Sequence, residues 1–82
     1  MKESEIVGKN VKGYREILGL SQEALADIAG VHRTYINQVE QGRVNISIIN
    51  IFKIAKALKV EANVLLIQDS SKKNKPKKTI SK

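Results

Sequence analysis

A three-residue turn, Gly30-Val31-His32, limits the fold of this chain more than any other feature. It joins two segments with helical periodicity, predicted at about 22–29 and 33–41. Ser21 is the expected N-cap of the first segment, and Gly30 stops it. So short a connection forces the two helices to cross steeply.

The rest of residues 3–68 also predicts helices, because no stretch alternates apolar and polar residues long enough for a strand. Helices are expected at about 4–18, 48–58 and 62–68, which gives five in all and an all-α fold. Ser4 and Ser47 are the expected N-caps of the first two. The side chains expected to face inward include Ile17, Leu18, Ile28, Ile48, Ile51, Phe52, Ile54, Ala55 and Leu58.

The predicted 62–68 helix is apolar on nearly every side, so it needs cover on two sides. One side can be the core of its own chain. A second copy of the chain most simply covers the other, which predicts a twofold homodimer. The residues expected at its interface are Val64, Leu65, Leu66 and Ile67.

The net charge of +7 is concentrated at one end, since residues 69–82 hold six lysines and one aspartate. This lysine-rich tail has one apolar side chain, Ile80, so we expect it to be disordered and residues 3–68 to form one domain. The tail lysines either form a solvated end or add non-specific affinity for phosphates. A basic chain favours polyanionic partners, nucleic acid before membrane.

Several functional classes lack the residues they need. The chain has no cysteine and one histidine, so we expect no metal site and no cofactor. No paired carboxylates stand at helix spacing in a cleft, which argues against an enzyme. The apolar runs are too short to span a bilayer, the N-terminus has no signal-peptide core, and the basic tail lacks a membrane-binding apolar face. A cytoplasmic location is expected.

The predicted 33–41 helix has an unusual polar face. A narrow stripe of Tyr35, Ile36 and Val39 seats the helix, and the opposite arc holds an arginine, a threonine and amides rather than the usual Glu and Lys. Such groups read base edges in the DNA major groove. The residues predicted to contact bases are Arg33, Thr34, Asn37 and Gln38. Those predicted to contact phosphates are Ser21, Gln22, Tyr35, Arg43 and Asn45.

Residues 20–42, LSQEALADIAGVHRTYINQVEQG, together with Ile54–Val60, resemble the lambda-repressor-like helix-turn-helix family of the Xre or Cro/cI type. The resemblance covers roughly residues 5–67. It includes small Ala26, turn Gly30 and apolar Leu25, Ala29, Val31, Ile36 and Val39. It implies five helices, dimeric binding in the major groove of double-stranded DNA, and an ion pair between Arg15 and Glu40 that joins the first helix to the recognition helix.

Arg33-Thr34-Tyr35-Ile36, followed by Glu40, Gly42, Asn45 and Ser47, is most similar to controller proteins of restriction–modification systems. Such controllers bind tandem operators as dimers and time the expression of the endonuclease. The chain departs from the pattern at His32, where a capping Asp or Ser is common, and at Val44, where an arginine commonly precedes Asn45. The Val44 difference removes one expected phosphate contact.

The sequence therefore predicts a sequence-specific dimeric transcription regulator that binds a pseudo-palindromic operator, as a controller of a restriction–modification system. A promoter-bound regulator, whether repressor or activator, implies RNA polymerase as a further partner. The alternatives are a phage-type or housekeeping repressor and an antitoxin-like module acting with a partner protein. The lysine-rich tail is a poor toxin-binding segment, because it is almost without apolar residues.

Overall fold

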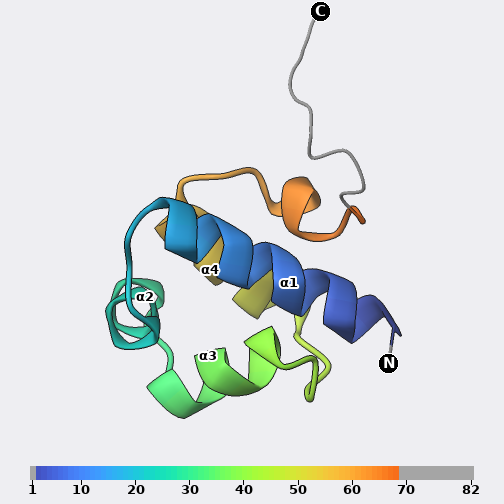
Figure 1. Cartoon of the computed structure of the whole chain (residues 1–82), viewed down its shortest axis with the longest axis horizontal. Helices are drawn as coiled ribbons and strands as arrows, with labels where there is room; N and C mark the ends of the chain where they lie inside the picture. Colours follow the sequence, from blue (N-terminus) through green and yellow to red (C-terminus); the bar gives the residue numbers. More distant parts are fainter. Residues whose placement is uncertain (1, 69–82) are drawn as a thin grey trace, which may run out of the picture.

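The computed structural model describes residues 2–68, which contain four α-helices and one short 3₁₀ helix, with no strand among these residues (Figure 1). The elements are α1 (Lys2–Ile17), α2 (Gln22–Ala29), α3 (Arg33–Glu40), α4 (Ile48–Leu58) and η1 (Ala62–Leu65). The predicted all-α class is confirmed, and α2 and α4 have the predicted bounds. The lysine-rich tail lies outside the described residues.

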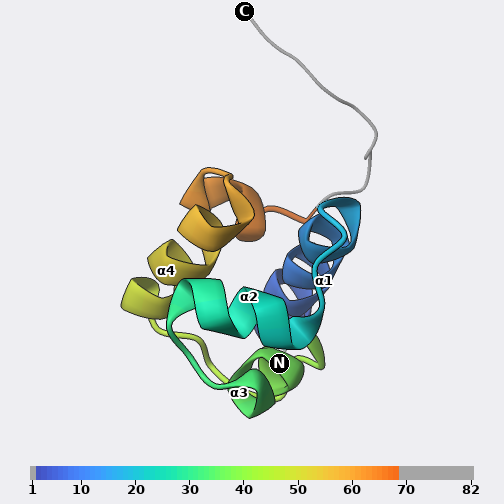
Figure 2. The same cartoon turned by 90° about the vertical axis from the view of Figure 1, so that its left-hand side faces the viewer.

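The core is formed by side chains from every helix. α3 packs against both α1 and α2, and α4 packs against α2 and α1 (Figures 1 and 2). Ile36 and Val39 of α3 are both buried, as the apolar stripe predicts. The buried apolar residues are Val7, Val11, Leu25, Ala26, Ala29, Ile36, Val39, Ile51, Ile54, Ala55, Ala57, Leu58 and Leu65. The burial of these apolar side chains away from water is the main force that holds α3 on the other helices.

The short turn between α2 and α3 forms as predicted, and the two helices lie across each other (Figure 1). The Ser21 Oγ accepts a hydrogen bond from the Ala24 amide at 2.9 Å, which caps α2. Gly30 ends α2 with φ of 77°, a left-handed conformation that glycine adopts without a Cβ clash. His32 is the N-cap residue of α3 but makes no capping hydrogen bond with its side chain.

α1 begins earlier than predicted, at Lys2, so the prediction of Ser4 as its N-cap is wrong. Ser4 is instead a buried residue within the helix, and its Oγ donates to Asn45 Oδ1 at 3.2 Å. At the other end, Ile17 and Leu18 are exposed although both were expected to face inward. Ile17 is the last residue of α1 and Leu18 follows it, so both stand where the helical wheel no longer describes the packing.

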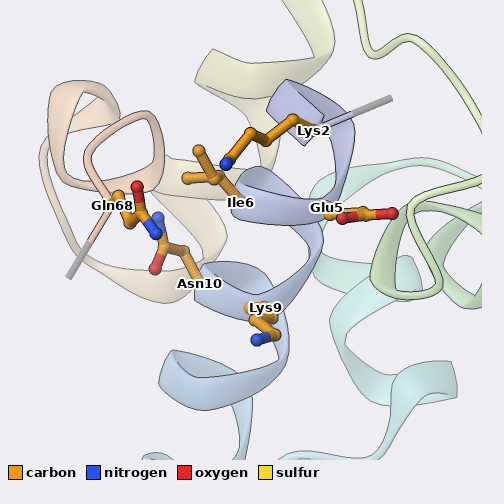
Figure 3. A pocket seen from close by; sticks show the side chains of 6 residues that line it. All are labelled: Lys2, Glu5, Ile6, Lys9, Asn10 and Gln68. Carbon is orange, nitrogen blue, oxygen red and sulfur yellow. The ribbon is translucent and has the colours of Figure 1, made fainter. Parts of the chain in front are cut away.

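The predicted fifth α-helix over 62–68 is wrong in extent and type, because the segment forms only the single turn of η1. Asn10 of α1 holds the end of this segment. Its Nδ2 donates to the carbonyl oxygens of Leu65 and Ile67 at 2.8 and 2.9 Å, so a side chain of α1 satisfies backbone groups that the short η1 leaves unpaired. Figure 3 shows the Asn10 and Gln68 side chains together, on the wall of a hollow of about 190 Å³.

Three further isoleucine and phenylalanine positions differ from the expected burial. Ile48 and Phe52 of α4 and Ile28 of α2 were expected to face inward, but each is more than half exposed. On α4, Ile51, Ile54, Ala55 and Leu58 fill the contact with the other helices. A helical wheel places Ile48 and Phe52 on the edge of this stripe but cannot show how far the neighbouring helices extend over it.

The backbones of α1 and α3 approach closely at Gly8. A Cβ atom built on Gly8 would overlap the Val39 carbonyl oxygen and lie 2.9 Å from the Glu40 carbonyl oxygen. Both obstacles are backbone atoms of α3, so neither can turn aside. The absence of a side chain at position 8 therefore sets how near α3 lies to α1.

Gly8→Ala is expected to destabilise the protein by about 1–3 kcal/mol, because the added methyl pushes α3 away from α1. Gly13→Ala is the matched control, since a Cβ at this exposed position of the same helix meets nothing within 4 Å. Alanine should stabilise the helix there by about 0.5–1 kcal/mol. Urea unfolding measures both; a Gly8→Ala variant as stable as the Gly13→Ala variant would contradict the close approach.

Candidate nucleic-acid interface

α3 presents a polar face to solvent. Arg33, Thr34 and Gln38 are exposed on it, and Asn37 is half-buried at its inner margin. The opposite side of the same helix holds buried Ile36 and Val39. All four residues predicted to contact bases therefore lie on one short helix with a fixed seat on the core, as recognition helices require.

An ion pair joins α1 to the last residue of α3. Arg15 Nε lies 2.6 Å from Glu40 Oε2, and Arg15 Nη2 donates to Glu40 Oε1 at 3.1 Å. Arg15 Nη1 also donates to the Leu20 carbonyl oxygen at 2.8 Å. The Arg15 and Glu40 side chains are 12% and 3% exposed, so the pair is largely shielded from water. The hydrogen bond to Glu40 raises the pKa of Arg15 above its ordinary value, so the guanidinium stays charged.

Hydrogen bonds continue from this ion pair to the polar face of α3. Gln22 Nε2 donates to Glu40 Oε1 at 3.0 Å, Asn37 Nδ2 donates to Gln22 Oε1 at 3.3 Å, and Gln41 Nε2 donates to Asn37 Oδ1 at 3.1 Å. We call Gln22, Asn37 and Gln41 the amide network. It links the shielded carboxylate of Glu40 to a residue predicted to read bases.

The residues predicted to contact phosphates flank α3 on both sides. Ser21 and Gln22 stand at the start of α2, where backbone N–H groups and the helix dipole favour an anion. One Nε2 hydrogen of Gln22 remains after its bond to Glu40. Arg43 is exposed in the loop after α3. Asn45, in the same loop, is exposed and held through its Oδ1 by Ser4.

Tyr35 is half-buried against the core, and its hydroxyl is not free as expected. The hydroxyl oxygen accepts a hydrogen bond from Asn50 Nδ2 of α4 at 3.0 Å. Its proton is still available to donate to a phosphate oxygen. Asn50 was not predicted as part of the site, because the helical wheel placed it on the outward side of α4 and gave no pairing with a residue fifteen positions away.

The residues predicted at a dimer interface do not share one environment. Leu65 is fully buried in the core of its own chain, so its assignment to an interface with a second copy is wrong. Its side chain fills the space where η1 contacts α1 and α4. The helical wheel of 62–68 is apolar on nearly every side and did not show which side would face this core. Val64 is half-buried, and Leu66 and Ile67 are exposed.

Exposed apolar side chains also gather on α4. Ile48 is 71% exposed, Phe52 is 61% exposed, and Ile49 is also exposed. Leu66 lies beside this helix, because it lines a hollow together with Ile51 of α4. We call Ile48, Ile49, Phe52 and Leu66 the α4 apolar surface. It was missed because Ile48 and Phe52 were assigned to the core.

Between residues 2 and 68, no helix is both long and apolar enough to cross a membrane.

The model of the HTH_3 family, described as helix-turn-helix, matches residues 11–65. Control protein C.SmaI of Serratia marcescens is 44% identical over 68 residues, which are 83% of this chain and 81% of that protein. The matched region includes α2, the turn and α3.

Solved structures of similar proteins have the same fold. The crystal structure of the restriction–modification controller protein C.AhdI from Aeromonas hydrophila has a TM-score of 0.77 and 38% identity, over 79% of this chain and 98% of that one. The crystal structure of SinR, a master regulator of biofilm formation, in complex with DNA has a TM-score of 0.71 and 34% identity, over 74% of this chain and 98% of that one.

Proposed function

We propose that this chain, which belongs to the HTH_3 helix-turn-helix family, is a sequence-specific, dimeric transcription regulator. The proposal further holds that it controls a restriction–modification system. α3 enters the DNA major groove, and Arg33, Thr34, Asn37 and Gln38 contact base edges. Ser21, Gln22, Tyr35, Arg43 and Asn45 contact phosphates and set the register of α3 along the duplex.

The observation that supports this function best is the composition of the exposed face of α3. Three of its four predicted base-contacting side chains are exposed, and none is a glutamate or aspartate that would repel phosphates. The helix-turn-helix relative SinR was crystallised with DNA. The restriction–modification role rests on the similarity to the control protein C.SmaI and to the controller C.AhdI.

The dimer rests on the α4 apolar surface. Several large apolar side chains gathered on one small domain mark a site of protein contact. A symmetric pair can bury the same surface from both chains, as twofold dimers do. We propose Ile48, Ile49, Phe52 and Leu66 as its centre, with Val64 and Ile67 at its margin. Two copies of α3 would then meet half-sites about one helical turn, 34–36 Å, apart.

Selection from random duplex DNA by the purified protein, at about 150 mM salt where non-specific binding is weak, tests the function. We expect recovery of a spaced inverted repeat. Two such repeats in tandem would support the controller role, whereas a single repeat would favour a repressor of another kind. Recovery of only salt-sensitive binding without a sequence would contradict the regulator and favour a module that acts with a partner protein.

Arg33→Ala is expected to weaken binding to the selected operator by about 1–3 kcal/mol and to relax preference at one base pair of each half-site. The reason is that arginine pairs with guanine through two hydrogen bonds. Arg43→Ala is the matched control, because a phosphate contact is lost on every sequence alike and the salt dependence becomes less steep. Titrations on single-base variants of the operator distinguish the two; an equal loss on all variants for Arg33→Ala would remove it from the base contacts.

A further inference from the structure

Asn37 is held at both ends of its side-chain amide. Its Nδ2 donates to Gln22 Oε1, and its Oδ1 accepts from Gln41 Nε2. Turning the amide by half a turn would exchange the donor and the acceptor. The contact with Gln22 would then set acceptor against acceptor, which opposes the turn, and the bond from Gln41 to Oδ1 would be lost unless Gln41 turned as well.

The direction of the amide network is set by the ion pair at its other end. Glu40 receives hydrogen bonds from Arg15 and is an ionised carboxylate, which only accepts. Gln22 must therefore present its Nε2 to Glu40, which leaves its Oε1 for Asn37. Each amide thus donates toward the ion pair, and Gln41, at the exposed end of the series, adds the bond that holds the Asn37 oxygen.

An orientation fixed in this way matters for reading a base. Asparagine recognises adenine by donating to N7 and accepting from the N6 amino group, in a set order. Asn37 retains one Nδ2 hydrogen and one Oδ1 lone pair after its contacts with Gln22 and Gln41. An amide free to turn could also accept from cytosine N4 or donate to guanine O6, and would discriminate less.

We propose that Gln41 is a specificity-determining residue that contacts no base itself and positions the Asn37 amide to read one base pair of each half-site. This inference rests on the proposed DNA-binding function. Gln41 was not among the residues predicted from sequence to contact bases.

The test compares Gln41→Met with Asn37→Ala and with the double variant. Methionine keeps the length of glutamine and removes its donor, and the exposed position leaves the fold unaffected. Gln68→Met is the control, because this exposed glutamine lies on the opposite side of α1 from α3 (Figures 1 and 3). Affinities are measured for the selected operator and for every single-base variant of one half-site.

Asn37→Ala should lose about tenfold of its preference at one base pair. Gln41→Met should lose about threefold at the same base pair, the effect of one hydrogen bond. The double variant should lose no more than Asn37→Ala alone, and Gln68→Met should match the wild type. In the DNA-free protein, the Asn37 side-chain amide resonances should shift in Gln41→Met.

A change at a different base pair would show that Gln41 reads DNA directly, and would overturn the proposal. Unchanged preference, unmoved Asn37 resonances or additive losses in the double variant would overturn it as well. In each of these cases a wild-type protein that selects an operator leaves the proposed function standing. A wild-type protein that selects no sequence overturns both.

Discussion

Glu40→Ala is expected to lower the free energy of unfolding by about 3–5 kcal/mol, the usual result of removing one partner of a buried ion pair. The variant leaves the Arg15 guanidinium, 12% exposed, with the Leu20 carbonyl oxygen as its remaining partner. It also removes the acceptor of the Gln22 amide. Small domains are marginally stable, so this loss is a large fraction of the total. Urea or thermal unfolding measures it, and DNA binding should weaken only in consequence.

The double variant Arg15→Met/Glu40→Leu is the control for this mechanism. Replacing both charges with apolar side chains of similar size removes the lone charge, so much of the stability should return. Equal melting temperatures for Glu40→Ala and the wild type would show that the ion pair does not hold α3 on α1. A double variant less stable than Glu40→Ala would show that the two charges are needed for reasons other than their pairing.

Phe52→Asp is expected to convert the dimer to a monomer and to weaken operator binding by about 10²–10⁴-fold, because two linked half-site contacts become one. The charge falls in the middle of the α4 apolar surface, and no part of the predicted DNA contacts is changed. Sedimentation equilibrium gives the association state, and a titration with the operator gives the affinity.

Ile17→Asp is the matched control for Phe52→Asp. Ile17 is an exposed isoleucine at the end of α1, outside the α4 apolar surface. The same new charge there should alter affinity only through its repulsion of phosphates and leave the dimer intact. If both variants stay dimeric, the interface lies elsewhere; if the wild type is a monomer on its operator, the dimer is wrong.

The helices that cap and turn residues define were predictable from sequence. Ser21 and Gly30 mark the two ends of α2, and Ser47 precedes α4. The serine hydroxyls accept hydrogen bonds from backbone amides three residues on, and Gly30 adopts a left-handed conformation without a Cβ clash. The outward face of α3 was also predictable, because its polar residues recur with the helical period. The structure also contains the Arg15–Glu40 pair that the family resemblance implied.

The parts that depend on distant contacts were not predictable. Asn10 bonds carbonyl groups 55 and 57 positions away, so the periodicity of 62–68 gave no sign that the segment would stay short. The burial of Leu65 follows from the same packing. The amide network joins α2 to α3 through side-chain orientations, which a helical wheel does not describe.

The direct contact of the α1 and α3 backbones at Gly8 bears on how such a protein can acquire a new target. Because α3 is seated by backbone and buried side chains, Arg33, Thr34 and Gln38 can be exchanged without moving the helix. Asn37 is tied to Gln22 and Gln41 and cannot be exchanged so freely. After gene duplication, new operators should therefore arise first by substitution at the three unconstrained positions, with the base pair that Asn37 is proposed to read inherited longest.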